Sequence, residues 1–226
     1  MARRSAGKTA ASSFHLIYRR LLQAFGPQGW WPADGPFEMM VGAILTQATN
    51  WHNVERALDR LTAARTLTPR ALAAMRRARL ERLIRPAGYF RQKAARLQRF
   101  SRWYLARYGG SPRRMFRVPW RRLRGQLLTL HGIGPETADA MLLYAGGRPV
   151  FVVDAYTMRV FRRHRLIAER ATYDDVQRAA MRSLPDVARL YNEFHALLVA
   201  VGKRHCHRRT PDCTRCPLGN LPHTTR

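Results

Sequence analysis

Apolar residues recur at helical spacing along most of this chain of 226 residues. The segment from Phe14 to Phe25 sets the pattern, because Ile17 and Leu21 fall on one face of a helix. The same period predicts helices over residues 37–45, 53–61, 71–75, 80–84, 92–108 and 120–128. Breaks rich in Gly and Pro separate these segments, as in residues 26–36. The sequence therefore predicts a chain of consecutive helices.

One short run departs from this pattern. Val150, Phe151, Val152 and Val153 have the composition of a strand. No segment of residues 1–149 shows the sustained alternation of a partner strand, and nothing nearby offers one. We therefore predict an all-α fold in which residues 150–153 are a buried connector.

The chain carries a large excess of positive charge, with 41 Lys and Arg against 14 Asp and Glu and a formal net charge of +27. Folding does not require this excess, which indicates a polyanionic partner such as nucleic acid. Hydrophobic residues make up 46%, enough for a buried core, so a wholly disordered basic protein is excluded. No apolar run approaches the roughly 20 residues of a membrane span. Residues 1–13 lack the apolar stretch of a secretory signal, and we predict a disordered basic tail there.

A glycine-rich turn lies between two predicted helices at residues 130–138, and we call this segment the hairpin. Gly132 and Gly134 permit a tight turn and close approach of the backbone, and Pro135 suits the first position of the next helix. Backbone N–H groups in such a turn are ready donors for a phosphate. The sequence thus predicts a helix–hairpin–helix that binds the DNA backbone without reading bases. The residues expected at the DNA are Gly132, Ile133, Gly134 and Thr137.

The three cysteines lie close together near the C-terminus. Cys206, Cys213 and Cys216 span eleven residues, too few thiols for a disulfide framework in a chain of this length. Their clustering indicates a reducing compartment and a metal site. Chance clustering of buried thiols is the alternative.

Four segments resemble the endonuclease III superfamily of base-excision DNA glycosylases. They are Leu45–Thr49, Ala87–Ala94, the hairpin and Val153–Asp154. The resemblance covers nearly the whole chain from about residue 14. In that family the residue matching Asp154 is the essential catalytic carboxylate, and the one matching Gln47 fills the gap left by a flipped nucleotide. Asp154 can also serve as the N-cap of a helix over residues 156–161, and one residue can fill both roles.

The resemblance also implies an architecture of two helical domains. A six-helix barrel over residues 36–149 would carry Gln47 and the hairpin. Residues 14–35 with 150–226 would form a second helical domain that ends in the cysteine loop. Catalysis is expected in the cleft between the domains, with Asp154 facing Glu136.

Glu136 occupies the position where the strand-cleaving members of the family carry a lysine. That lysine forms a Schiff base with C1′, which neither a carboxylate nor an arginine can do. Only three of the 41 basic residues are lysines. Lys8 lies in the tail, Lys93 matches a basic residue on the DNA-backbone side in the family, and Lys203 adjoins the cysteines. We therefore predict a monofunctional glycosylase, in which Glu136 either lines the pocket or only complements the helix dipole.

Within the superfamily the chain most resembles the 3-methyladenine DNA glycosylase III group. That group also carries glutamate at the lysine position, Trp-Trp-Pro ahead of the barrel, here Trp30-Trp31-Pro32, and an aromatic residue shortly after the inserted glutamine, here Trp51. An alkylated purine is cationic, so aromatic faces attract it. We therefore expect Trp30, Trp31 and Trp51 to form the base pocket, with core packing as the alternative.

The resemblance assigns the cysteines to an iron–sulfur loop. Four thiolates usually hold such a cluster, but the fourth cysteine position here is Pro222. His223 lies one residue later, and His205 and His207 are also close. A [4Fe–4S] cluster held by Cys206, Cys213, Cys216 and His223, a labile cluster, zinc and no metal all stay open. Basic residues surround the cysteines and suit phosphate contact or simple solvation: Lys203, Arg204, Arg208, Arg209 and Arg215.

The sequence leaves three competing functions open. A mismatch uracil or thymine glycosylase also lacks the lysine, a bifunctional endonuclease III-type enzyme would cleave abasic sites, and a DNA-binding module would need no Asp154. The expected partner is double-stranded DNA with a damaged base. We expect a monomer without membrane attachment, in the cytoplasm with the nucleoid.

Overall fold

The computed structural model describes residues 3–31 and 33–225, with side chains from residue 13 onward. The chain divides into two compact units. The terminal unit comprises residues 1–30 and 149–226, and the central unit comprises residues 31–148. Within the described ranges every regular element is helical, which confirms the all-α prediction. No described helix is long and apolar enough to cross a membrane.

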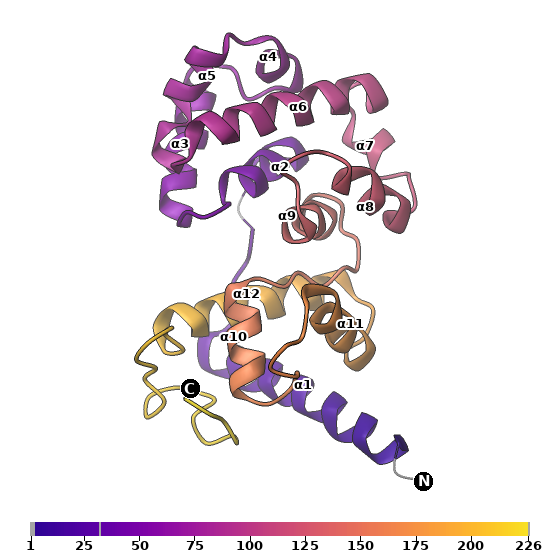
Figure 1. Cartoon of the computed structure of the whole chain (residues 1–226), viewed down its shortest axis with the longest axis vertical. Helices are drawn as coiled ribbons and strands as arrows, with labels where there is room; N and C mark the ends of the chain where they lie inside the picture. The colour runs from indigo at the N-terminus through magenta and orange to yellow at the C-terminus, as the bar shows by residue number, and fades with distance from the viewer. Residues whose placement is uncertain (1–2, 32, 226) are drawn as a thin grey trace. The chain divides into compact units, whose positions relative to one another are not determined.

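The central unit is built around α6 (Phe90–Tyr108), the long helix that Figure 1 shows between α2 on one side and α4 and α5 on the other. Phe37, Phe100 and Tyr104 stack beside one another in its core, with ring centroids 5.7–5.8 Å apart. The remaining elements of the unit are α2 (Pro36–Leu45), α3 (Trp51–Ala63), α4 (Pro69–Ala74), α5 (Arg77–Leu83), η1 (Arg85–Ala87), α7 (Pro112–Met115), α8 (Trp120–Leu128), α9 (Pro135–Ala140) and η2 (Met141–Ala145).

Local sequence signals set several of these boundaries. Asn50 caps α3 by accepting a hydrogen bond from the Asn53 amide, and Thr68 caps α4 ahead of Pro69. Gly109, in the left-handed conformation, ends α6. Thr68 and Gly109 flank helices where the sequence predicted them, whereas α3 begins two residues before the predicted range of 53–61.

The terminal unit contains α1 (Arg3–Phe25), α10 (Ala155–Arg163), α11 (Tyr173–Ser183) and α12 (Ala188–Arg204). Helix α1 packs on α11 and α12, and α10 packs on α12 (Figure 1). Four aromatic rings from separate segments meet in its core: Phe14, Phe151, Phe161 and Phe194. Residues 150–153 are buried and without regular structure, as predicted for the connector.

The N-terminal segment differs from its prediction. Helix α1 begins at Arg3, so a helix occupies most of the segment for which we predicted a disordered tail, while residues 1 and 2 lie outside the described residues. The segment lacks a clear apolar period, but Ala6, Ala10 and Ala11 favour a helix. These alanines are the signal that the sequence analysis overlooked.

Candidate active site and DNA-binding surface

Asp154 lies at the start of α10, directly after the buried connector. Its Oδ1 accepts a hydrogen bond from the Thr157 amide at 2.7 Å, which makes Asp154 the N-cap of α10. The connector residues Val152 and Val153 are almost fully buried and fix the chain just before it. One carboxylate oxygen is therefore held by the helix, as the capping interpretation expected.

The second carboxylate oxygen of Asp154 faces a histidine. Nε2 of His195, on α12, lies 3.6 Å from Oδ2 of Asp154, and the two side chains are only 8% and 13% exposed. Burial alone would raise the pKa of Asp154. The His195 imidazole and the Thr157 amide outweigh that effect and hold the pKa below its ordinary value. Asp154 is therefore an ionised carboxylate in a nearly closed environment.

Close packing of α10 against α12 brings these two side chains together. A Cβ atom at Gly202 would collide with the Tyr156 ring, so the glycine lets the helices approach. Arg159 joins the same helices by donating to the carbonyls of Cys206, at 2.6 Å, and Gly202, at 3.3 Å. The sequence analysis missed His195, because neither its spacing from Asp154 nor its position in an apolar segment marks it.

The hairpin in the central unit contains two glycines, and the fold constrains them differently. Gly132 has φ +90°, and a Cβ there would lie 2.5–2.7 Å from three atoms of the Arg96 side chain. Gly134 has an ordinary backbone conformation with nothing within 4 Å of a Cβ. Gly132 is thus required by the fold, whereas no contact among the described residues requires a glycine at position 134. The Ile133 side chain is buried, so only its backbone is available for the predicted contact with DNA.

Gln47 is attached to the hairpin. Its Nε2 donates to the Gly132 carbonyl at 2.9 Å and to Thr137 Oγ1 at 2.8 Å. Arg96 of α6 donates to the Gln47 Oε1. The structure therefore brings together Gln47, Gly132 and Thr137, all named from the sequence, and adds Arg96, which the sequence analysis missed.

A buried ion pair joins α8 and α9, the helices on either side of the hairpin. Arg124 of α8 binds Asp139 of α9 through two contacts, Nε to Oδ1 at 2.7 Å and Nη2 to Oδ2 at 3.1 Å. The Asp139 side chain is fully buried. Glu136, in the first turn of the same helix, is exposed. A negative charge in the first turn complements the helix dipole, and a role of Glu136 in the base pocket stays a prediction.

Lys93 does not lie on a DNA-facing surface. Its side chain is fully buried, and Nζ donates to the carbonyls of Leu45, at 2.9 Å, and Ala87, at 2.6 Å. Burial, with a smaller effect of Arg96, lowers the pKa of Lys93 to about 8. The assignment of Lys93 to the DNA-backbone side disagrees with this position, because two backbone carbonyls satisfy the ammonium group. Lys93 instead ties the end of α2 to η1.

Two of the three predicted pocket tryptophans meet in the central unit. Trp31 and Trp51 form an edge-to-face pair with ring centroids 4.7 Å apart. The Tyr144 ring also contacts Trp31, with ring centroids 5.2 Å apart. Trp51 Nε1 donates to Glu55 Oε1 at 2.6 Å, which fixes the ring. Tyr144 belongs to η2, a π-helical turn, a feature often found at functional sites. Trp30 belongs to the terminal unit, and Pro32 lies outside the described residues.

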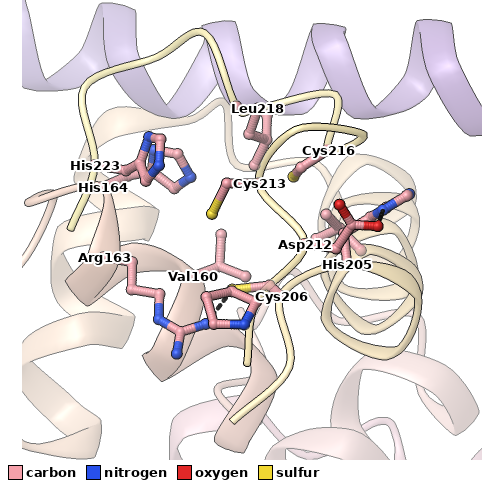
Figure 2. A pocket seen from close by; sticks show the side chains of 13 residues that line it. Val160, Arg163, His164, His205, Cys206, Asp212, Cys213, Cys216, Leu218 and His223 are labelled. Atoms are coloured by element: carbon pink, nitrogen blue, oxygen red, sulfur yellow. Dashed lines mark hydrogen bonds and ion pairs between the residues drawn. The ribbon is translucent and has the colours of Figure 1, made fainter. Parts of the chain in front are cut away.

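The three cysteines line one small cavity in the terminal unit, together with imidazole groups (Figure 2). Arg163 Nη1 donates to the Cys206 sulfur at 3.1 Å. Gly219 is required here, because a Cβ would collide with the Cys213 carbonyl. We call residues 205–225 the cysteine loop. Burial raises the pKa of the Cys216 thiol.

The histidine side of this cavity includes a residue that the sequence analysis did not name. His164 and His223 lie side by side in Figure 2, with ring centroids 5.7 Å apart. Burial lowers the pKa of His164, which keeps its imidazole neutral and able to bind a metal. His205 also lines the cavity, whereas His207 is exposed.

The thiols and imidazoles are the donor types of an iron–sulfur or zinc site. Their present arrangement does not complete a ligand set. Within residues 3–31 and 33–225, no group of three or more His, Cys, Asp or Glu side chains is placed to hold a metal ion. The donor chemistry fits a metal centre, and the spacing of the side chains does not.

A basic hollow of about 470 Å³ lies beside the start of α10. Its lining includes Lys203, Arg208 and His207, next to Ala155 and Tyr156. Cations around an open hollow suit a phosphate oxygen. The hollow belongs to the terminal unit, and two of its lining residues, Ala155 and Tyr156, directly follow Asp154 in the sequence.

The comparisons with known proteins agree with these features. Residues 41–186 match the HhH-GPD superfamily, described as base excision DNA repair proteins. A putative DNA repair glycosylase of Methanocaldococcus jannaschii is 41% identical over 206 residues, which cover 90% of this chain and 93% of the relative. A thymine-DNA glycosylase of Aeropyrum pernix is 29% identical over 214 residues, covering 91% and 92% of the two chains.

One solved structure adds a ligand to this comparison. The crystal structure of the H. pylori 3-methyladenine DNA glycosylase, bound to 1,N6-ethenoadenine, is 29% identical with a TM-score of 0.73. The match covers 85% of this chain and 97% of that chain.

The chain is helical and carries a helix–hairpin–helix motif followed by the capping carboxylate of Asp154. Together with the family match and the relatives described above, these features define a DNA glycosylase. The chain belongs to the HhH-GPD superfamily of base-excision DNA repair proteins. This confirms the resemblance to the endonuclease III superfamily found in the sequence.

Proposed function

We propose that this glycosylase is monofunctional and hydrolyses the N-glycosidic bond of an alkylated purine flipped out of duplex DNA. The observation that carries the proposal is the aromatic group of Trp31, Trp51 and Tyr144 in the central unit. Electron-rich ring faces favour a cationic alkylated base over a neutral one. The 1,N6-ethenoadenine bound by the H. pylori enzyme, an adenine with an added ring, supports a modified purine as the substrate.

Asp154 supplies the charge for this reaction. As the C1′–N bond breaks, its electron pair leaves with the base, so a cationic base departs neutral and needs no strong acid. Positive charge develops at C1′, where the ionised carboxylate of Asp154 stabilises it. Water then adds to C1′ and gives its proton to the carboxylate or to solvent. The products are a free base and an intact abasic site.

Access of the damaged base depends on the DNA contacts. We assign Gln47 to the gap left by the flipped base and the backbone amides of Gly132 to Gly134 to a phosphate. The hollow lined by Lys203 and Arg208 supplies a second phosphate contact.

The lysine positions support the absence of lyase activity. Lys93 is buried with its ammonium group bound to two carbonyls, so it cannot attack C1′ in this conformation. Glu136 cannot form an imine. Borohydride trapping on an abasic duplex tests this directly. We expect no covalent adduct, and any adduct would refute the monofunctional assignment; its loss in a Lys203→Arg variant would identify Lys203 as the nucleophile.

A panel of duplexes tests the base. Each duplex carries one 3-methyladenine, 7-methylguanine, hypoxanthine, uracil or mismatched thymine, and alkali reveals the abasic product. We expect excision of the alkylated purines, reduced in Trp51→Leu and retained in the matched variant Trp103→Leu. Excision confined to uracil and thymine would instead support the second candidate, a mismatch glycosylase, which the similarity to the Aeropyrum enzyme favours.

We also propose that the cysteine loop holds a [4Fe–4S] cluster through Cys206, Cys213, Cys216 and a histidine. The shared cavity supports this assignment, and the loop would have to draw its donors closer together. The protein purified without oxygen should absorb near about 400 nm, and Cys213→Ser should lose that absorbance. Comparison of His223→Ala with His164→Ala identifies the fourth ligand. Stoichiometric zinc without iron would overturn the cluster.

A further inference from the structure

The buried contact between α12 and the start of α10 carries a role that the proposed function does not include. We infer that His195 is a positioning residue that keeps the carboxylate of Asp154 ionised and oriented for glycosidic bond hydrolysis. This inference rests on the proposed function of Asp154 as the catalytic carboxylate.

The geometry divides the carboxylate between two partners. Oδ1 of Asp154 accepts from the Thr157 amide at 2.7 Å, and Oδ2 lies 3.6 Å from His195 Nε2. The first contact comes from the helix that Asp154 begins, and the second comes from a different helix. Neighbours at both oxygens restrict rotation of the carboxylate, whereas the cap alone would hold only Oδ1.

Electrostatics explain why a second partner is needed. A carboxylate withdrawn from water favours its neutral form, which cannot stabilise positive charge at C1′. Burial acts on Asp154 in this direction, and His195 is the largest opposing influence. The Thr157 amide adds to it but is smaller. Removal of His195 should therefore raise the pH at which Asp154 becomes protonated.

The other titratable groups near the start of α10 include Lys203, His207 and Arg208, which line the basic hollow, and none of them is among the influences on the pKa of Asp154. Burial raises the pKa of Tyr191, one turn before His195, to about 12, so that it stays neutral. Neighbouring contacts include Gln28 N to Glu193 Oε1, Val153 N to Tyr173 OH, and Arg159 to the carbonyls of Cys206 and Gly202. Of the side chains that lower the pKa of Asp154, His195 has the largest effect.

A purely structural histidine would give a different signature from a positioning one. If His195 only fills space, an apolar residue of similar size should leave the pH dependence of excision unchanged. If it holds the charge of Asp154, loss of the ring N–H should alter that dependence while DNA binding stays intact. A side chain that returns an N–H to the same place should restore it.

The experiment measures single-turnover excision of the best base from the duplex panel, between about pH 5 and about pH 9. The variants are His195→Leu, His195→Gln and His195→Asn. The Gln amide extends further than the Asn amide and is the better match to Nε2. Tyr191→Phe is the control, because it removes a buried polar group from the same helix at one turn's distance. Affinity for an abasic-product duplex and thermal melting accompany each variant.

We expect His195→Leu to move the acid limb of the rate profile upward by about one pH unit and to lower the rate below it about tenfold. His195→Gln should recover most of the rate, His195→Asn less, and Tyr191→Phe should match the native enzyme. Product affinity should stay the same throughout. If His195→Leu does not fold, the comparison of Gln with Asn decides the question alone.

Two outcomes separate this inference from the proposed function. Full activity of Asp154→Asn would overturn the catalytic role of Asp154 itself. An inactive Asp154→Asn beside a His195→Leu profile that matches the native one would overturn only the role of His195. A uniform loss of rate at every pH, with Gln no better than Leu, would also refute it and mark His195 as a packing residue.

Discussion

Lys93 carries one of the three ammonium groups of the chain into the core of the central unit. Its partners are the Leu45 and Ala87 carbonyls, at the end of α2 and in η1. Because Leu45 lies two residues before Gln47, this lysine anchors the segment that presents the glutamine. A residue type usually assigned to a surface is here part of the scaffold.

The lowered pKa of Lys93 makes a stability prediction. The folded value is about 8 against an ordinary 10.5, so between these values the unfolded chain binds more protons than the folded one. The free energy of unfolding should therefore rise with pH across this window. The Lys93→Met variant lacks the ammonium group and therefore lacks this pH-dependent contribution to the free energy of unfolding. Urea midpoints measured at about pH 7.5 and about pH 10 should rise more in the native protein than in Lys93→Met, and parallel curves would contradict the burial.

The two hairpin glycines allow a matched test at the scale of the element. An alanine at Gly132 must adopt φ +90° and displace Arg96, and the backbone strain alone costs about 1–3 kcal/mol. We expect Gly132→Ala to melt several degrees lower. Gly134→Ala should melt like the native protein, because nothing lies near its Cβ.

The same pair separates folding from DNA binding. A methyl group at Gly134 would stand between the hairpin amides and a phosphate, so Gly134→Ala should lose about tenfold in affinity for an abasic duplex. Calorimetric melting and a binding titration on both variants suffice. Unchanged DNA affinity of Gly134→Ala would remove the hairpin from the DNA interface.

The ion pair between α8 and α9 predicts where the hairpin is weakest. Arg124→Met leaves the Asp139 carboxylate buried without its bidentate partner, which should cost about 3–5 kcal/mol of stability. Arg122→Met removes the same charge from an exposed position of the same helix and should cost little. Equal unfolding midpoints for the two variants would show that the pair contributes nothing.

Helical periodicity predicted most elements of the central unit closely. The helix expected over residues 120–128 spans Trp120–Leu128, and the one expected over 37–45 spans Pro36–Leu45. Glycine and proline positions likewise identified the hairpin. These signals depend only on residues close together in the chain, so they can be recognised from the sequence alone.

The contacts that define the sites are mostly non-local, and the sequence does not reveal them. His195 is 41 residues from Asp154, and only the crossing of α10 and α12 brings them together. The burial of Lys93 was missed because backbone carbonyls, which every residue has, supply its partners. The role of Arg96 was missed for a related reason, since nothing distinguishes it from the other arginines in the sequence.

At the scale of the whole molecule, the charge of +27 predicts strong salt dependence of DNA binding. Each neutralised phosphate releases counterions, so 6–10 contacts would lose roughly 10³- to 10⁵-fold in affinity between about 50 and about 200 mM salt. The double variant Lys203→Gln with Arg208→Gln should lower the slope of log affinity against log salt by about two. The double variant Arg70→Gln with Arg79→Gln is the charge-matched control, and equal slopes for the two would exclude the hollow from the interface.

The burial of Lys93 also bears on how the surface charge responds to chemical modification. Acyl groups attach to amines and leave guanidinium groups untouched, since arginine stays protonated. Of the two lysines whose side chains the structure describes, Lys93 is enclosed and Lys203 alone is exposed. Almost all of the positive surface is therefore arginine, which acetyl donors cannot discharge. Such a surface should keep its positive charge, and therefore its affinity for DNA, under acylating conditions that would neutralise the surface of a lysine-rich protein.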